Sequence, residues 1–436
     1  MKFMSTRGGT AVGLDDALLQ GIAADGGLFV AATLPVYSPD HFAAADGIRA
    51  IAELFLQPFF AASKLRDALP EIVAETFAFP IPLTEIPGCG RSLQMLELYH
   101  GPTAAFKDVG AGFLAACLGR LHSIAEQPLT ILVATSGDTG GAVAAAFNER
   151  PGTRVVVLFP DGRVSARQAR QLCCWGDNVL SLSVRGSFDD CQAMVKAAMA
   201  DGTLSARHRF SSANSINIGR LLPQSIYYAD ASLRHYSRTG KRPSFVVPAG
   251  NLGNAFACIL AREMGLPIGE IVLASNANRI IADFLNGAEW LPRASIRTLA
   301  SAMDVGNPSN MERLRKLLGD ASSLRQQLQV FSVDDDQIED EIRRNFTEHA
   351  LVVCPHTATA TCAYRQLDAA QRRDQDWIVV ATAHPAKFEQ IVEPLIGQVV
   401  PIPDALQQIL SRPMHAVTVQ PDLASLAGAL DDAFVP

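Results

Sequence analysis

One lysine, in the string HGPTAAFKD from His100 to Asp108, constrains this chain more than any other feature. Lys107 follows a Gly-Pro pair and precedes GAGFLAACLGRLHSIA, in which small and apolar residues recur at three- and four-residue spacing. This pattern predicts a loop that enters a helix at Lys107. Apolar walls and the positive end of a helix both disfavour the ammonium form, as a Schiff-base lysine requires. A solvated lysine at a helix start is the alternative.

A glycine-rich loop follows the apolar run LTILV, Leu129 to Val133. Its sequence is ATSGDTGG, and AVAAAF comes next, so the order predicts a strand, a tight loop and a helix. Backbone N–H groups at a helix start, together with the hydroxyls of Ser136 and Thr139, favour binding of an anion. An ordinary turn capped by Asp138 or Thr139 would explain the same residues.

A second loop, VPAGNLGN from Val247 to Asn254, also lies between an apolar run and a helical pattern. Its glycines let the backbone approach a ligand closely, and its N–H groups can form a nest for an anion. The spacing is neither GxGxxG nor GxxxxGK[ST]. The loop therefore suits a terminal phosphate monoester better than a pyrophosphate.

A third segment, NSINIGRLLPQ from Asn214 to Gln224, gathers two amides, a hydroxyl and Arg220 within one or two helical turns. A guanidinium offers a planar fork of donors, so the segment can bind a carboxylate or a phosphate. For Arg220 the plainer alternative is a salt bridge on the surface of a helix.

The composition indicates a folded chain with a large core. Its 436 residues are 48% hydrophobic and 19% charged, which suits two or three packed domains. The net charge of −7 and the lack of a basic run argue against nucleic-acid binding. We expect no signal peptide and no membrane span, and a cytoplasmic location. The eight scattered cysteines favour core positions in a reducing compartment over disulfides or a zinc site.

Short apolar runs alternate with helical patterns from Leu129 to Gln224, and again from SFVVPAG to WIVVATAHP. This order predicts an α/β fold with two α/β domains, one inserted in the other, and a ligand in the cleft between them. The charged segment from Leu318 to Arg344 indicates a solvated helical surface. The expected division is a helix-leaning N-terminal domain at residues 1–91, a large domain at 92–108 and 225–436, and a smaller domain at 109–224.

Together these motifs resemble those of the threonine synthase family, pyridoxal-phosphate enzymes of fold type II (the tryptophan-synthase-β-like group). The resemblance covers nearly the whole chain, because MSTRGG, DALLQGIAADGGLFV, ASNANRII, SAMDVGNPSNMERL, PHTATA and ATAHPAKF match as well. It implies a carbon–oxygen lyase that converts O-phospho-L-homoserine and water to L-threonine and phosphate. Phosphate would leave by γ-elimination and water would add at the β carbon, in the last step of threonine biosynthesis. The cofactor would be pyridoxal 5'-phosphate.

The resemblance also implies roles for individual residues. The implied site residues are Lys107 as the catalytic and cofactor-binding lysine; Asp138, Gly250, Asn251, Leu252, Gly253, Asn254 and Thr382 as further cofactor-binding residues; and Ser136, Thr139, Ser215, Asn217 and Arg220 as substrate-binding residues. Thr382 would face the ring nitrogen, although a strand threonine bonded to backbone is an alternative. Asp138 would lie near the ring hydroxyl, in an open protonation state. Asn254 could cap the following helix, and Lys387 is a second candidate cation.

Two other functions fit parts of the sequence. A lyase of the same fold, either a threonine-synthase-like phospho-lyase or a serine/threonine dehydratase, would release 2-oxobutyrate, but dehydratase substrates carry no phosphate for Arg220 to bind. A non-catalytic pyridoxal-phosphate-binding scaffold is opposed by the presence of Lys107 and both glycine loops. We expect a monomer or a small homo-oligomer.

Overall fold

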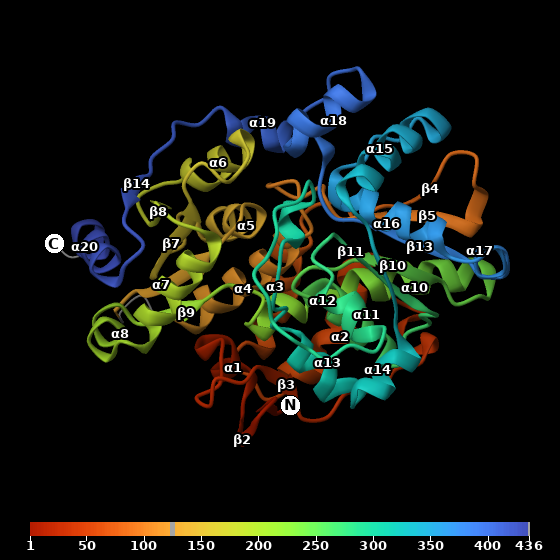
Figure 1. The fold of residues 1–436 in the computed structure, drawn as a ribbon. Coiled ribbons are helices and arrows are strands. Elements are labelled where there is room, and N and C mark those ends of the chain that lie inside the picture. The colour runs from red at the N-terminus through yellow and green to blue at the C-terminus, as the bar shows by residue number, and fades with distance from the viewer. Residues whose placement is uncertain (123–126, 435–436) are drawn as a thin grey trace.

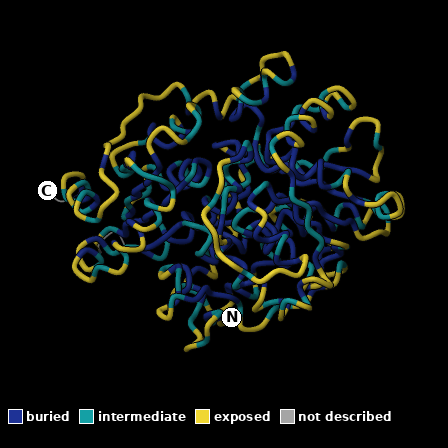
Figure 2. Tube along the Cα trace, viewed as in Figure 1, coloured by how far each residue is buried: buried dark blue, intermediate teal, exposed yellow. Residues whose placement is uncertain are grey.

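Two sheets flanked by helices form the body of the protein (Figure 1), and a third, smaller sheet lies near the N-terminus. The structure is a computed structural model that describes residues 1–122 and 127–434. The central strands of the two main sheets are mostly buried, whereas the outer helices carry many of the exposed positions (Figure 2). Such layering agrees with the α/β class expected from the sequence.

The larger sheet has six strands in the order β12-β11-β10-β13-β5-β4. Its strands are β4 (Leu83–Glu85), β5 (Leu93–Glu97), β10 (Ser244–Pro248), β11 (Ile271–Ser275), β12 (Gln329–Ser332) and β13 (Trp377–Ala381). All pairs are parallel except β4 with β5. Because β13 lies between β5 and β10, the segments that follow these three strands leave the same edge of the sheet side by side. One of these segments contains Lys107, and another contains the 250–254 loop.

The second sheet has five parallel strands in the order β14-β8-β7-β6-β9. Its strands are β6 (Leu129–Ala134), β7 (Thr153–Pro160), β8 (Val179–Val184), β9 (Phe210–Ser212) and β14 (Val417–Val419). The pairing of β14 with β8 differs from the expected grouping of residues 225–436 in one domain. The chain returns to the second sheet near its end, where β14 and the helix after it lie beside β8 (Figure 1).

The N-terminal region combines a small antiparallel sheet with helices. Its strands are β1 (Phe3–Ser5), β2 (Gly8–Val12) and β3 (Phe29–Ala31), and β1 pairs with both of the others. The sequence indicates the helices but not this sheet, since β1 and β3 have only three residues each and β2, with the sequence GGTAV, has no buried residue.

The helices cover the sheets on both faces. Their bounds are α1 (Leu14–Gln20), α2 (Gly47–Phe60), α3 (Leu69–Thr76), α4 (Lys107–Leu121), α5 (Asp138–Phe147), α6 (Ala166–Cys173), α7 (Phe188–Ala200), α8 (Gly202–His208), α9 (Ile218–Leu221), α10 (Gln224–Thr239), α11 (Gly253–Glu263), α12 (Ile280–Leu285), α13 (Met311–Leu318), α14 (Ala321–Gln327), α15 (Asp335–His349), α16 (Pro355–Gln366), α17 (Ala369–Asp374), α18 (Glu389–Ile396), α19 (Asp404–Leu410) and α20 (Leu423–Phe434). Shorter 3-10 helices are η1 (Pro39–Phe42), η2 (Arg66–Ala68), η3 (Gly90–Ser92), η4 (Ser301–Met303) and η5 (Pro385–Phe388). Among the described residues, none of these helices has the length and apolarity that crossing a membrane requires.

The charged segment from Leu318 to Arg344 contains a strand as well as helices. The expectation of an entirely helical surface is wrong for β12, which pairs in parallel with β11 at the edge of the larger sheet. All four residues of β12 are only half-buried, so the strand lacks the apolar run by which the central strands are recognised.

Replacing Phe245 with alanine should destabilise the larger sheet. Phe245 is fully buried in β10, directly before the 250–254 loop, and its ring meets that of Tyr228 at 5.3 Å. Removing a ring of this size from a core costs about 3–5 kcal/mol. Urea unfolding should show a much lower midpoint for Phe245→Ala. Val417→Ala, at a side chain that is 48% exposed, should leave the midpoint nearly unchanged. Equal midpoints for both variants would contradict this packing.

Candidate active site

Backbone hydrogen bonds hold the lysine loop against the segment that follows β13. The N–H of Phe106 donates to the carbonyl of Thr382 at 2.8 Å, and the N–H of His384 donates to the carbonyl of Ala104 at 3.0 Å. Helix α4 then begins at Lys107 itself, as the sequence predicts. Lys107 and Thr382 therefore stand on adjoining segments.

Lys107 is half-buried and lies among other charged groups. Burial is the main reason that the pKa of Lys107 falls to about 8. Asp138 opposes this shift, whereas the positive charges of Lys387 and Arg220 add to it. The alternative of a solvated lysine does not agree with this burial. A lowered pKa makes the free amine accessible near neutral pH, which a lysine nucleophile or base requires.

Asp138 is the first residue of α5 and carries a buried carboxylate. Its Oδ1 accepts hydrogen bonds from Lys387 Nζ at 2.8 Å and from Gln168 Nε2 at 3.1 Å. Burial alone would raise the pKa of Asp138, but Lys387, Lys107 and His356 together lower the pKa well below its ordinary range. Asp138 is therefore ionised, which answers the question that the sequence left open.

The loop between β6 and α5 is shaped by a threonine that the sequence did not single out. Thr135 Oγ1 accepts hydrogen bonds from the N–H groups of Gly137 and Gly140, both at 2.9 Å. Gly137 is the N-cap residue of α5, and no side-chain cap bond is formed there, so the capped-turn alternative does not hold. Ser136 and Thr139 are both half-buried in this loop.

The loop after β10 brings backbone close to its surroundings at two glycines. A Cβ on Gly250 would lie 2.7 Å from Met303 Cα, and a Cβ on Gly253 would lie 2.9 Å from a methyl carbon of Leu221. Leu252 between them has a positive φ of 61°, which turns the chain into α11. The first N–H groups of this eleven-residue helix are thus presented at a tight loop, an arrangement that suits a phosphate.

Asn251 connects this loop to the third motif. Its Nδ2 donates to Ser215 Oγ at 2.6 Å, and its Oδ1 accepts from the N–H of Ser309 at 2.7 Å. Asn310 Nδ2 donates to the carbonyl of Asn251 at 3.0 Å and to Ser215 Oγ at 3.3 Å. The expected cofactor loop and the expected substrate segment therefore belong to one hydrogen-bonded network.

Arg313 supports this network and was missed by the sequence reasoning. Its side chain is fully buried, and its guanidinium donates to the carbonyls of Ser215 at 2.9 Å, Ile216 at 2.6 Å and Phe29 at 3.0 Å, and to Asn310 Oδ1 at 2.6 Å. The one signal in the sequence is the three-residue spacing of Asn310 and Arg313 at a helix start. These contacts fix the backbone of the segment that carries Ser215.

Arg220 is 3% exposed, which rules out the alternative of a surface salt bridge. One Nη donates to the carbonyl of Ala213, whereas Nε has no hydrogen-bond partner among the residues that the structure describes. Burial lowers the pKa of Arg220 to about 10, against the influence of Asp108, so the guanidinium stays charged at neutral pH. A buried cation with an unused donor suits an anionic ligand.

The side chain of Asn217 bonds to the protein itself, whereas the sequence predicted that it binds the substrate. Its Nδ2 donates to the carbonyls of Leu18 at 2.9 Å and Ser212 at 3.1 Å, and its Oδ1 accepts from the N–H of Gly219 at 2.9 Å. Both amide hydrogens are thus used within the protein. Asn217 caps α9 and holds the segment in place, and we do not carry it into the proposed substrate site.

Asn254 also differs from the expectation. The N-cap residue of α11 is Leu252, so Asn254 does not cap the helix. Its Oδ1 instead accepts hydrogen bonds from the hydroxyls of Tyr227 at 2.6 Å and Tyr228 at 2.9 Å. Through Oδ1 the side chain of Asn254 joins α11 to α10, whereas its buried Nδ2 has no hydrogen-bond partner among the described residues.

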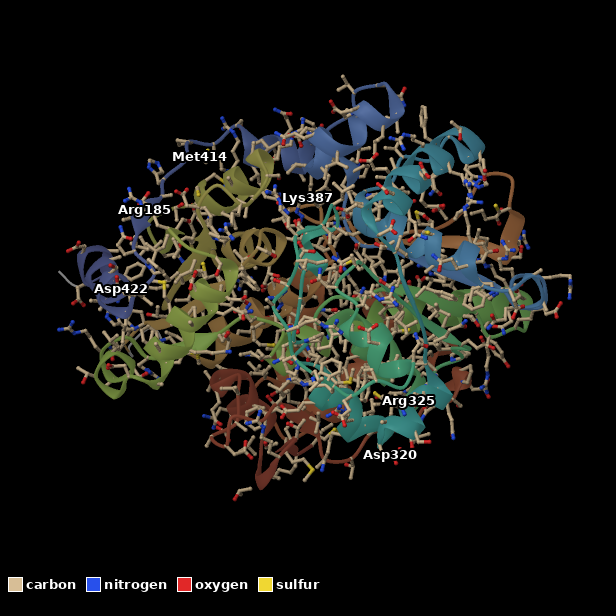
Figure 3. The ribbon with its side chains drawn as sticks, viewed as in Figure 1. Arg185, Asp320, Arg325, Lys387, Met414 and Asp422 are labelled. Atoms are coloured by element: carbon tan, nitrogen blue, oxygen red, sulfur yellow. The ribbon has the colours of Figure 1, made fainter. Side chains whose placement is uncertain are left out.

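The ammonium group of Lys387 is bonded to other protein groups, whereas a second cation for the substrate would be available to bind it. The side chain of Lys387 is fully buried, and Nζ donates to the carbonyl of Thr103 at 2.8 Å in addition to its contact with Asp138. Figure 3 shows Lys387 close to α6, on which Gln168 lies. Its ammonium is engaged by the protein itself.

Comparison with known proteins identifies the family. A family profile described as pyridoxal-phosphate dependent enzyme matches residues 75–383, and profiles for the threonine synthase N terminus and C-terminal part match residues 2–77 and 357–429. The threonine synthase of Serratia marcescens is 36% identical over 418 residues, which cover 95% of each chain. The chain belongs to the threonine synthase family.

Solved structures of this family confirm the fold. The threonine synthase of Escherichia coli superposes with a TM-score of 0.90 at 35% identity, covering 99% of this chain and 100% of that one. The pyridoxal-phosphate-bound threonine synthase of Brucella melitensis superposes with a TM-score of 0.91 at 31% identity, covering 100% of both chains. The expectation of a fold type II α/β enzyme is therefore confirmed.

Pyridoxal 5'-phosphate is the cofactor of this family, and the residues of the site fit it. Lys107 offers a half-buried amine whose pKa is about 8, suited to the cofactor's aldehyde. Gly250 and Gly253 leave a close-fitting loop at the start of α11, suited to the cofactor's phosphate.

Replacing Gly250 with alanine should weaken cofactor binding. The new methyl group would lie 2.7 Å from the backbone of Met303, so the loop must shift. Overpacking of this kind costs about 1–3 kcal/mol, and we expect the dissociation constant for pyridoxal phosphate to rise about tenfold or more. Equilibrium dialysis measures this constant. Gly202→Ala, where a Cβ meets nothing within 4 Å, is the matched control. Unchanged affinity in Gly250→Ala would remove this loop from the cofactor site.

Proposed function

We propose that this member of the threonine synthase family converts O-phospho-L-homoserine and water to L-threonine and phosphate. The observation that carries the proposal is the grouping of a lysine of lowered pKa with two separate places for phosphate. One place is the glycine loop at α11, and the other is the buried guanidinium of Arg220. A cofactor phosphate and a substrate phosphate would occupy them.

Each part of the site would have a distinct task. The residues proposed to hold the cofactor are Lys107, Asp138, Thr382, and the backbone of Gly250, Asn251, Leu252, Gly253 and Asn254. Thr382 would face the ring nitrogen with a neutral hydroxyl, and Asp138 would lie near the ring hydroxyl. Bound in this way, pyridoxal phosphate stabilises the negative charge that develops on substrate carbons when their protons leave.

Lys107 would act as the base. As a free amine it would take the proton from the Cα atom of the substrate and pass it on before it takes a proton from Cβ. After phosphate has left, protons would be returned to Cγ, which becomes the methyl group of threonine, and to Cα. A pKa of about 8 suits both directions of transfer, because neither the amine nor the ammonium is then strongly favoured near neutral pH.

Ser136, Thr139, Ser215 and Arg220 would hold the substrate. The half-buried hydroxyls of Ser136 and Thr139 would bind its carboxylate together with loop N–H groups. Ser215 and Arg220 would bind the phosphate as it leaves Cγ. A guanidinium that is already fixed before the reaction stabilises the departing charge without reorganisation, which is the efficient form of electrostatic catalysis.

One assay distinguishes this function from its nearest alternative. Purified protein is incubated with pyridoxal phosphate and O-phospho-L-homoserine, and phosphate, threonine and 2-oxobutyrate are measured together. Equal amounts of phosphate and threonine are expected. Phosphate with 2-oxobutyrate would identify a phospho-lyase instead, and no release of phosphate would contradict the proposal altogether.

Some wider properties also stay proposals. We propose a cytoplasmic location, supported by eight free cysteines, seven of them buried, which suit a reducing compartment. We propose a monomer or a small homo-oligomer. We keep the predicted domain division, with β14 added to the smaller, inserted domain because it pairs with β8.

Lys107→Ala should abolish turnover and remove the visible absorbance of lysine-bound cofactor. The reason is that Lys107 would supply both the covalent bond and the base. Absorbance spectra of the purified variant, with a threonine assay, test this. Lys316→Ala, on α13, serves as a control for general effects of removing a lysine. An unchanged cofactor spectrum in Lys107→Ala would show that another lysine binds the cofactor.

Arg220→Leu should cripple the reaction with O-phospho-L-homoserine and leave the bound-cofactor spectrum intact. Losing a buried charged partner costs about 2–5 kcal/mol, so kcat/KM should fall about a hundredfold or more. Lysine should restore little activity, because it lacks the planar fork.

The control for Arg220→Leu is the slow side reaction with L-serine, which carries no phosphate. A local lesion spares this reaction, whereas misfolding lowers both activities together. If both activities fall equally while the spectrum and the unfolding midpoint are normal, Arg220 does not bind the leaving phosphate.

A further inference from the structure

Two lysines compete for one carboxylate at the centre of the site. Lys387 Nζ lies 2.8 Å from Asp138 Oδ1, and the two side chains are 0% and 4% exposed. Lys107 is close enough for Asp138 to influence its charge, but no hydrogen bond or ion pair joins these two among the described residues. The cation that pairs with this carboxylate is therefore Lys387, and the amide of Gln168 also donates to it.

Lys387 is held where it can keep this partner. Its ammonium also donates to the carbonyl of Thr103 at 2.8 Å, within the lysine loop. Helix α6 holds the chain on either side of Lys387, because Arg167 donates to the backbone carbonyl of Ala386 and forms an ion pair with the side chain of Glu389 at 3.4 Å. Figure 3 shows the resulting closeness of Lys387 to α6. The 3-10 helix η5 thus joins the segment after β13 to the smaller sheet's helices.

Four charged or titratable groups influence Lys107, each from a different element. They are Asp138 on α5, Lys387 on η5, Arg220 on α9 and His356 on α16. Burial lowers the pKa of His356 to about 4, so its ring is neutral near pH 7. Within this group Asp138 is the sole anion, and it is the carboxylate that acts on Lys107. A second buried carboxylate, Asp108, accepts hydrogen bonds from the N–H and the hydroxyl of Thr103, and its charge acts on Lys387 and Arg220.

We propose that Lys387 is a positioning residue for Lys107: by holding the carboxylate of Asp138, it denies Lys107 a counter-ion and so keeps Lys107 a free amine. The proposal rests on the proposed function, in which Lys107 bonds the cofactor. It gives Lys387 a part in the reaction without contact to the substrate. It also explains why the ion pair of Lys387 and Asp138 is buried beside Lys107, which has to lose its proton.

Removing the charge of Lys387 should release Asp138 to pair with Lys107. An opposite charge at close range shifts a lysine toward the ammonium form by about 1–3 pH units. Lys107 would then need a higher pH to become reactive. Lys387→Arg keeps the charge and should keep the behaviour of the parent.

The test measures capture of pyridoxal phosphate by the full chain after the cofactor has been removed. The rate constant is recorded across pH values, and ionisation of the cofactor itself is common to all variants. For the parent, the pH at which this rate constant reaches half of its maximum should lie near 8, because it follows the pKa of Lys107. We call this pH the midpoint. For Lys387→Met it should rise by about one unit or more. Lys241→Met, which removes an exposed lysine, is the matched control and should not move it.

Further variants show whether the effect passes through Asp138. The double variant Lys387→Met with Asp138→Asn removes the carboxylate that acts on Lys107, so its midpoint should not exceed that of the parent by more than about 0.5 unit. A rise in the double variant as large as in Lys387→Met would overturn the proposal. An unchanged or lowered midpoint in folded Lys387→Met would overturn it as well.

Two safeguards keep the test decisive. If Lys387→Met does not fold, Lys387→Gln replaces it, because an amide can still donate to the carbonyl of Thr103 but lacks the charge that neutralises Asp138. Its midpoint should rise in the same direction, and an unchanged midpoint contradicts the proposal. In every sample, borohydride reduction and peptide mass spectrometry identify the lysine that carries the cofactor. A lysine other than Lys107 would overturn the proposed site instead of the part played by Lys387.

Discussion

Burying a cation is expensive unless its surroundings compensate it, and this site buries three. Arg313 is compensated by three backbone carbonyls and an amide oxygen, and Lys387 by a carboxylate and a carbonyl. Arg220 is compensated less completely, since its Nε finds no partner among the described residues. Such compensation works only where the carbonyls are held in place. The two sheets provide this, because the loops leaving their strands are joined to one another by hydrogen bonds.

The connection between Asn251 and Ser215 has a functional meaning. It joins the loop that suits the cofactor's phosphate to the segment proposed for the substrate's phosphate. Through Arg313, the same segment is also attached to the N-terminal region at Phe29. A shift of the backbone at any of these three places would shift the other two. The N-terminal region therefore contributes to the geometry of the site, although it contains no proposed catalytic residue.

Local patterns made much of this architecture predictable. The helix start at Lys107 and both strand-loop-helix units depend on residues adjacent in the chain. Their local sequence patterns are therefore enough to predict them. The roles of side chains whose partners are distant in the chain could not be predicted from the sequence. An amide such as Asn217 or Asn254 has the same donors and acceptors whether it meets a ligand or a backbone carbonyl, and only the folded geometry decides. The three-residue spacing of Asn310 and Arg313 does not by itself distinguish a buried arginine from an exposed one.

The late position of β14 has a consequence for how the protein is made. β14 pairs with β8, although about 230 residues separate them in the chain. At roughly 5–20 residues per second, a ribosome adds that stretch in about 10 to 50 seconds. During this time the outer edge of β8 presents unpaired backbone groups, a template for unwanted strand pairing. Once β14 has been made, its pairing with β8 covers that edge.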